Sequence, residues 1–278
     1  MGLSRADESE WRIVDDQRDS QLALKRRLLA EHRVDVLAFA PDIDSAPACA
    51  ELLRMLENGG RMLVPLRGHG PAMDPENGGG SGGAGASGAS GGSGALERAA
   101  GSVQEDLCVL LPDASGRLVL AAACVCFPSH WRLRDKIGLP VSRIHVPVPR
   151  YEQELARKVD MFVERLRPGV VMTRRNWLIH ETGDLFVPDP PAAADPAMPP
   201  EQLWLRSERQ ALRRLPESGG VAFTIHTQQA QIGVLERRPD VAAALAARLV
   251  AQPGELTRYA EYRAHVPALV HRLRAWRS

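Results

Sequence analysis

The fold is decided by residues 106–127, which read DLCVLLPDASGRLVLAAACVCF. Two apolar runs, Leu107–Leu111 and Leu118–Phe127, lie on either side of a connection that contains proline, aspartate and glycine at 112–116. Residues of these three types favour tight turns between strands. The stretch therefore predicts a β-hairpin.

Three further segments alternate apolar with polar residues and are predicted to be strands: Val170–His180, Leu203–Leu215 and Val221–Thr227. Residues 217–220 (ESGG) predict a hairpin between the last two. Helices are predicted at Ser20–His32, Ala46–Leu56, Ala95–Glu105, Tyr151–Arg167, Val241–Val250 and Leu256–Trp276, with Pro267 interrupting or restarting the last one. Central strands with helices at both ends predict an α+β fold with one mainly antiparallel sheet.

The helix predicted at Ser20–His32 is amphipathic, because its leucines alternate with Lys25 and two arginines. Residues 70–94 form a Gly- and Ser-rich stretch that predicts a flexible loop, and a Pro- and Ala-rich stretch predicts a second loop at 188–200. No strand precedes the first loop, so a phosphate-binding role is not expected. Residues 1–278 are expected to form a single domain.

The composition excludes several classes of protein. The chain of 278 residues carries 35 basic and 34 acidic residues, so no net field would attract nucleic acid or an anionic membrane. The four cysteines have no zinc or cluster spacing, and Cys124 and Cys126 alternate on one strand as small core residues. No membrane-spanning run and no signal peptide are visible, which predicts a cytoplasmic protein.

A constrained histidine lies in residues 143–149, which read RIHVPVP. Each proline fixes its own φ and restricts the residue before it, so the backbone around His145 has little conformational freedom. Such rigidity suits a metal ligand. The alternative is a half-buried histidine in an irregular edge segment.

Together with other motifs, this segment resembles the haem-dependent oxidative N-demethylase family, also catalogued as a domain of unknown function and related to the haem subunit of dimethylamine monooxygenase. The resemblance runs from about Trp11 to Trp276. The motifs that carry it are Val103–Leu107, Ile144–Pro149, Arg174–Trp177, Leu205–Gln210, Leu212–Pro216 and Phe223–Ile225.

The resemblance implies a PAS-like five-stranded antiparallel sheet with haem b packed between the sheet and a helix, and His145 as the iron ligand. It also implies a monooxygenase that oxidises an amine with O2 and electrons from an external flavin and iron–sulfur reductase. The chain departs from the family pattern after Ile225, where it reads HTQQAQ at 226–231, so an amine larger than dimethylamine is an open alternative. A haem-binding PAS sensor without catalysis is the alternative function, and a relative that has lost haem is a third.

Other histidines compete with His145 as the ligand. His226 is the main rival, because it alternates with Thr224 on one face of a predicted strand. His130 and His180 follow residues typical of strand ends. His265 and His271 lie between arginines on a terminal helix, where a solvent-exposed face is expected.

Strand alternation predicts that Arg174 and Asn176 share one face of the sheet, and that Arg175 and Trp177 share the other. Arg174 and Asn176 could bind a propionate or polarise dioxygen, or they could simply face solvent. Glu208 could bind a cationic amine, or it could form an exposed ion pair with an arginine. Arg209 and Trp177 complete the candidate cofactor-binding residues.

Overall fold

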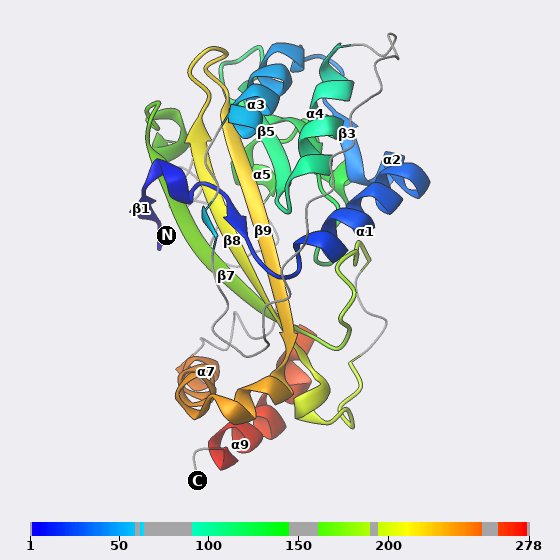
Figure 1. The fold of residues 1–278 in the computed structure, drawn as a ribbon, viewed down its shortest axis with the longest axis vertical. Helices are drawn as coiled ribbons and strands as arrows, with labels where there is room; N and C mark the ends of the chain where they lie inside the picture. The colour runs from blue at the N-terminus through cyan, green and yellow to red at the C-terminus, as the bar shows by residue number, and fades with distance from the viewer. Residues whose placement is uncertain are drawn as a thin grey trace, which may run out of the picture.

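In the computed structural model the chain folds around one open antiparallel sheet of seven strands (Figure 1). The structure describes residues 2–58, 62–63, 91–144, 161–189, 194–251 and 261–276. The strand order is β1-β7-β8-β9-β5-β6-β3. These strands are β1 (Ser4–Ala6), β3 (Leu37–Phe39), β5 (Asp106–Pro112), β6 (Leu118–Cys124), β7 (Val171–His180), β8 (Trp204–Arg214) and β9 (Val221–Gln231). The two-residue strands β2 (Ile13–Val14) and β4 (Met62–Leu63) form a separate parallel pair.

Helices precede and follow the central strands. The α-helices are α1 (Arg18–Glu31), α2 (Arg33–Val36), α3 (Ala46–Asn58), α4 (Gly91–Ser102), α5 (Val141–Ile144), α7 (Pro239–Ala251) and α9 (Val266–Ala275). The 3-10 helices are η1 (Glu8–Glu10), η2 (Leu133–Asp135), η3 (Pro200–Gln202), η4 (Ile232–Arg237) and η5 (Glu261–His265). Within the described ranges, no helix has the length and apolar character needed to cross a bilayer.

The predicted α+β architecture is confirmed, and so is the hairpin over residues 106–127, because β5 pairs antiparallel with β6. Asp113 makes the turn: its Oδ1 accepts hydrogen bonds from the backbone N–H groups of Ser115 (2.8 Å) and Arg117 (3.0 Å). Gly116 takes a φ of +81°, which a residue with a side chain rarely adopts. The turn therefore uses the residue types that the sequence places there.

Several predicted boundaries and one strand count were wrong. The sheet has seven strands rather than five, because the short strands β1 and β3 extend the edges of the five central strands. Residues 91–94 of the predicted 70–94 loop are the first turn of α4, and that helix ends at Ser102 rather than at Glu105. Gly92 permits this start, since a Cβ there would lie 2.7 Å from the Cα of Ala46 on α3. The strand predicted at Val221–Thr227 continues to Gln231.

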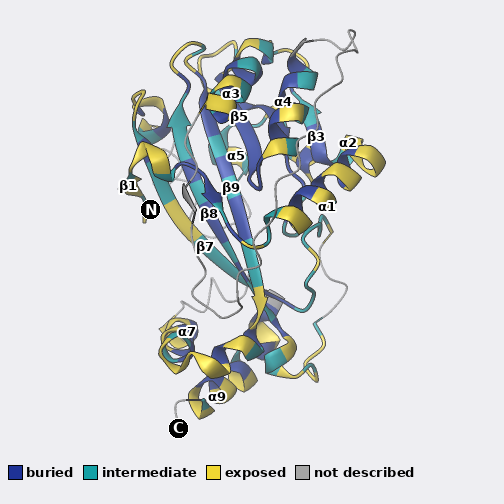
Figure 2. Ribbon diagram, viewed as in Figure 1, coloured by how far each residue is buried: buried dark blue, intermediate teal, exposed yellow. Residues whose placement is uncertain are grey.

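The sheet has two differently covered faces. On the face that we call face A, Val109, Ala222 and Val171 pack against buried residues of α1, α3 and α4. On the other face, face B, Cys108, Phe223, Leu212 and Met172 lie in register across four strands. Face B packs against residues from the long connection between β6 and β7, which include Leu133, Ile144, Val163 and Leu166. Figure 2 shows the buried central strands between these layers.

A third cluster of buried residues joins the far end of the sheet to the C-terminal helices. Ile179 and Ile232 pack with Leu245 and Leu249 of α7 and with Leu269 of α9. These helices lie at the opposite end of the molecule from α3 and α4 (Figure 1). Of the two predicted roles of Pro267, the restart is the one observed, because this proline occupies the first turn of α9, where its missing N–H costs no helical hydrogen bond.

Candidate functional site

The predicted site residues lie on three long neighbouring strands, and the pairing of β7, β8 and β9 arranges them in cross-strand rows. On face B, Asn176 lies opposite Glu208, which lies opposite Thr227. On face A, Arg175 lies opposite Arg209, which lies opposite His226. Directly opposed residues of antiparallel strands share a face, so the alternation predicted for residues 174–177 is confirmed.

The same pairing separates the predicted site residues into two groups. Arg174, Asn176 and Glu208 lie on face B, whereas Arg209, His226 and Trp177 lie on face A. One planar cofactor cannot contact both faces of a sheet, so these candidates cannot all contact the same cofactor directly. Which group could face a cofactor is decided by what covers each face.

Face B changes from apolar to polar along the strands. Met172, Leu212 and Phe223 form an apolar row, and the next row on this face is Arg174, Gln210 and Ile225. The following row, Asn176–Glu208–Thr227, is polar. Arg174 is exposed, and Asn176 and Gln210 are partly exposed. An apolar surface therefore adjoins a set of hydrogen-bonding groups on one face.

Glu208 is held in place rather than exposed. Its carboxylate accepts hydrogen bonds from Arg206 Nε (3.3 Å) and from Gln210 Nε2 (3.3 Å), and the residue is only 9% exposed. The alternative of an exposed cross-strand ion pair is therefore wrong, because Glu208 pairs with Arg206, which is buried and lies two residues away on the same strand. Thr227 is fully buried, and among the described residues its hydroxyl has no hydrogen-bond partner. Such an atom is expected to meet a ligand or a water.

Arg206 and Asp106 connect the polar end of face B to the residues that follow β6. The Arg206 guanidinium donates to the carbonyl groups of Phe127 and Leu185. Asp106 accepts from the backbone N–H groups of Cys126 (2.8 Å) and Phe127 (2.9 Å), and burial raises the pKa of its carboxyl group. Asp106 belongs to the 103–107 motif, so this part of the motif has a structural role.

Lys25 contradicts the amphipathic prediction for α1, because it is fully buried. Its Nζ donates to the carbonyl groups of Val103 (3.0 Å) and Glu105, and lies 4.0 Å from Asp106 Oδ1. A buried ammonium group is tolerated only where carbonyl or carboxylate oxygens satisfy it. The 103–107 motif supplies these oxygens, which the helical periodicity around Lys25 does not reveal.

His226 is enclosed on face A by the N-terminal segment. It is 1% exposed, and its Nε2 lies 3.3 Å from Asp15 Oδ2, yet neither ring nitrogen makes a hydrogen bond among the described residues. Burial lowers the pKa of His226, against the opposing effect of Glu105 and Asp15, and this favours the neutral imidazole. Arg209 binds the backbone carbonyl groups of Glu10 and Trp11. These contacts hold residues 10–15 against the sheet.

Asp15 is the centre of the polar contacts in this region. Its carboxylate accepts from Gln104 Nε2 (2.7 Å) and from Gln228 Nε2 (2.8 Å). Gln104 also donates to Gln21 Oε1 (3.0 Å), and Gln21 donates to the carbonyl group of Thr227 (2.8 Å). Face A is therefore filled by the protein's own polar side chains near His226.

Trp177 also has a packing role. Its ring stacks on Tyr262 of η5, with the ring centroids 6.2 Å apart. It packs against the cluster of buried residues that holds the C-terminal helices. His265 was expected to face solvent, but it is buried, and its Nε2 lies 2.6 Å from Glu181 Oε1.

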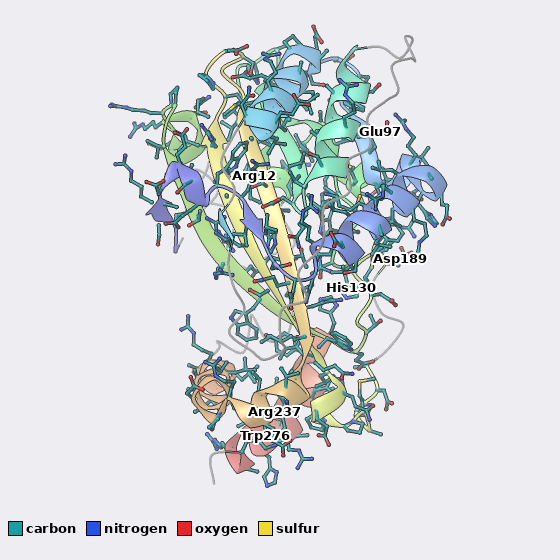
Figure 3. The ribbon with its side chains drawn as sticks, in the orientation of Figure 1. Arg12, Glu97, His130, Asp189, Arg237 and Trp276 are labelled. Carbon is teal, nitrogen blue, oxygen red and sulfur yellow. The ribbon has the colours of Figure 1, made fainter. Side chains whose placement is uncertain are left out.

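Sequence reasoning set His180 aside as a strand end, although it shares face B with Arg174 and Asn176. Its Nε2 lies 3.1 Å from Ser129 Oγ, and its ring stacks on His130 with the centroids 4.9 Å apart. Burial, with Arg206 and His130 nearby, lowers the pKa of His180 to about 4. His130 has a φ of +58°, and its Nδ1 lies 2.7 Å from the carbonyl oxygen of Asp189 (Figure 3). The alternation from Met172 to His180 was the signal that could have placed His180 on face B.

The predicted iron ligand, His145, lies outside the described residues. Ile144, which precedes it, and Phe162, Val163 and Leu166, which follow after residue 160, all pack in the cluster on face B. No group of three or more His, Cys, Asp or Glu side chains in the described ranges could hold a metal ion. Haem iron needs only one protein ligand, so the lack of such a group does not bear on a haem site.

Comparison with known proteins identifies the family. The model of the family described as haem-dependent oxidative N-demethylase, alpha subunit-like, matches residues 86–270. This is more than half of the chain and includes β5 to β9, although the match begins later than the expected Trp11. No curated protein matches the chain significantly. The chain belongs to the haem-dependent oxidative N-demethylase, alpha subunit-like family.

Proposed function

We propose that this chain binds haem b against face B and oxidises an N-alkyl amine, such as an N-methyl amine, with O2 and electrons from an external flavin and iron–sulfur reductase. The observation that carries the proposal is the boundary on face B between the apolar row of Met172, Leu212 and Phe223 and the polar row of Asn176, Glu208 and Thr227. Face A is the less favourable surface, because α1, α3, α4 and the N-terminal segment cover its described part, whereas Met172, Leu212 and Phe223 of face B are only partly buried.

The residues on face B fit a haem group chemically. A porphyrin requires an apolar surface for its ring and cationic or hydrogen-bonding groups for its propionates. Met172, Leu212 and Phe223 are only partly buried by the connection between β6 and β7 and would supply the apolar surface, and Arg174 is an exposed cation without an ion-pair partner among the described residues. The unpartnered hydroxyl of buried Thr227 supports a ligand on this face. Haem, when bound, supplies the activation of dioxygen, which no side chain can perform.

The side chains on face B would then bind the haem and orient the substrate. We propose that Arg174 binds a propionate and that the Asn176 amide donates a hydrogen bond toward the reacting groups. Glu208 is fixed by Arg206 and Gln210, so its carboxylate can orient an amine or hold a proton at a defined position. Arg209, His226 and Trp177 would act indirectly, by holding the N-terminal segment and the C-terminal helices on the sheet.

We propose His145 as the iron ligand. Its neighbours before and after the undescribed residues pack on face B, which supports a ligand delivered to that face. His226 is the weaker candidate, because Asp15, Arg209 and the N-terminal segment enclose it on face A.

The reaction consumes one O2, two electrons and two protons. One oxygen atom is inserted into the C–H bond next to nitrogen, and the other leaves as water. The resulting carbinolamine splits into the dealkylated amine and an aldehyde. The sequence predicts no GxGxxG-bearing βαβ unit, because its GxGxxG patterns lie in the Gly- and Ser-rich stretch that no predicted strand precedes, and it has no four-cysteine cluster pattern; both support an external electron donor. We expect this reaction in the cytoplasm, where the four free cysteines would remain reduced.

An absorption spectrum of the full chain reconstituted with haem tests the first step. We expect a Soret band that His145→Ala abolishes or greatly weakens, with His226→Ala as the matched variant that leaves it in place. The reverse result would make His226 the ligand. Aldehyde release from a secondary amine, NADPH and O2 should then require an added reductase. Turnover without reductase would contradict the scheme, and haem binding without turnover on any amine would favour the gas-binding sensor.

A further inference from the structure

Residues 183–189, which come shortly after β7, lie across the polar end of face B, and we call them the strap. Arg206 and Gln229, which are directly opposite each other on β8 and β9, hold the strap from the sheet. Arg206 donates to the carbonyl oxygen of Leu185 (3.2 Å), and Gln229 donates to that of Gly183. Two strands therefore bind the strap through its backbone.

The other end of the strap is attached to the chain that follows β6. Ser129 and Val187 form a parallel β-bridge. The backbone N–H of His130 donates to Val187 O (2.7 Å), and the N–H of Val187 donates to Pro128 O (3.3 Å). Asp189 ends the strap, and its carbonyl oxygen lies 2.7 Å from His130 Nδ1 (Figure 3). The strap is thus held at both ends.

The strap adjoins two buried polar groups of face B. The guanidinium of Arg206, which binds Leu185, also binds Glu208 Oε1 (3.3 Å). Glu208 is 9% exposed, and Thr227, directly opposite it, is fully buried with no hydrogen-bond partner for its hydroxyl among the described residues. A ligand could reach these two groups only if the chain above them moves. Opening of the strap would uncover the row of residues next to them.

A stack of two histidines lies where the strap meets the sheet. The rings of His180 and His130 are 4.9 Å apart and nearly parallel, at 13°. His180 Nε2 lies 3.1 Å from Ser129 Oγ. Burial, followed by the charges of Arg206 and His130, lowers the pKa of His180 to about 4. A proton on His180 would therefore place an imidazolium beside the Arg206 guanidinium in a buried position, which is unfavourable.

The acidic groups of the surrounding elements have partners of their own. Glu208 of β8 pairs with Arg206, Asp189 of the strap with Arg132, and Glu181, the residue after β7, with His265. Asp184 of the strap accepts from the hydroxyl of Thr182 (2.8 Å). On β9, the residue opposite Arg206 is the uncharged Gln229. Neutralising a protonated stack would require one of these contacts to break.

We propose that the strap is an acid-sensitive closure of face B, which is held while His180 is neutral and is released when His180 and the stacked His130 take up protons. The closure does not involve the cofactor, so it is independent of the proposed function. Opening lets water reach the His180 ring, and its pKa then returns to the ordinary value of 6.5. The closed strap is therefore fully stable above this value and loses stability as the pH falls toward 4. For these two pKa values, acidification from pH 7 to about pH 4.5 raises the equilibrium constant for opening ~60-fold.

The experiment measures amide hydrogen exchange of the full chain at pH 7 and about pH 4.5, corrected for the intrinsic effect of pH on exchange. The reporters are the amides of Val187 and His130, whose hydrogen bonds join the strap to residues 128–130. They should exchange faster than the amides of β8 and β9 at pH 7, and their opening should increase ~60-fold in acid. His180→Gln keeps an amide near Ser129 but cannot gain a charge, so it should lose this response. The exposed His271→Gln is the control and should keep it.

Arg132→Gln tests the attachment of the strap separately from the histidine stack. Arg132 Nε donates to Asp189 Oδ1 (2.7 Å), so this variant should raise the exchange of Val187 at both pH values and leave the acid response intact. Arg238→Gln breaks a similar exposed pair with Asp240, just before α7, and should change neither.

The proposal fails if Val187 and His130 exchange only together with β8 and β9, because opening would then be global unfolding. It also fails if His180→Gln keeps the wild-type acid response. Should His180→Gln not fold, a pH series on the wild-type protein decides. Opening must then increase ~7-fold between pH 6 and pH 5 and stay constant above pH 7, and a flat series would overturn the proposal.

Discussion

Lowering the pH is predicted to destabilise the folded protein through His180. The ordinary pKa of histidine is near 6.5, and burial beside Arg206 and His130 lowers the pKa of His180 to about 4. The unfolded chain therefore binds a proton that the folded chain excludes between these two values. The stability that depends on neutral His180 is fully present above pH 6.5 and is lost as the pH falls toward 4. At about 1.36 kcal/mol per pH unit, the loss at pH 4 is about 3 kcal/mol.

The assay is urea unfolding of the wild-type protein and of His180→Gln at pH 7 and pH 4. Other groups also titrate over this range, so the informative quantity is the difference between the two proteins in their loss of unfolding free energy. Wild type should lose about 3 kcal/mol more than His180→Gln. The exposed His271→Gln is the control, and it should lose as much as wild type. Equal losses in wild type and His180→Gln would refute the reasoning, because His180 would then titrate alike in both states.

Three further substitutions should lower the free energy of unfolding in urea at pH 7. Lys25→Met leaves the buried Asp106 carboxylate without its cation and should cost about 3–5 kcal/mol; a loss under about 1 kcal/mol would contradict the role of this pair. Leu96→Ala opens a cavity at a fully buried position of α4 and should cost about 2–5 kcal/mol, whereas a loss within error would mean that the site collapses. Glu51→Leu leaves the backbone N–H groups of Glu217 and Ser218 without their acceptor and should cost about 1–3 kcal/mol, and no loss would show that water replaces it.

Much of the sheet was predictable because its strands carry their own local signals. The hairpin of β5 and β6 has its turn residues in place, and the alternation along 174–177 assigns these four side chains to the correct faces. The short strands β1 and β3 carry no such signal. Each has only three residues, and tertiary pairing with β7 and β6 makes them strands.

The candidate site was less predictable, because which of its residues lie together depends on how the strands pair and on which segments cover each face of the sheet. Alternation places Arg209 and Glu208 on opposite faces, but the sequence does not say which face is covered by the N-terminal segment. Lys25 illustrates the same limit. Its neighbours indicate a solvent-facing position, and only the carbonyl groups of Val103 and Glu105, brought close by folding, explain its burial.

The contact of Glu51 with the turn between β8 and β9 has a consequence for how the two strands align. Its carboxylate accepts the N–H groups of Glu217 (2.7 Å) and Ser218 (2.8 Å), so a helix on face A fixes the tip of this hairpin. A slip of one residue in one strand would turn its alternate side chains to the opposite face. In β8, such a slip in one of its two directions would present Arg209 where Glu208 now lies, and the polar row beside Thr227 would become cationic. The chemistry available on face B is thus protected from misalignment by a residue of α3, on the other side of the sheet.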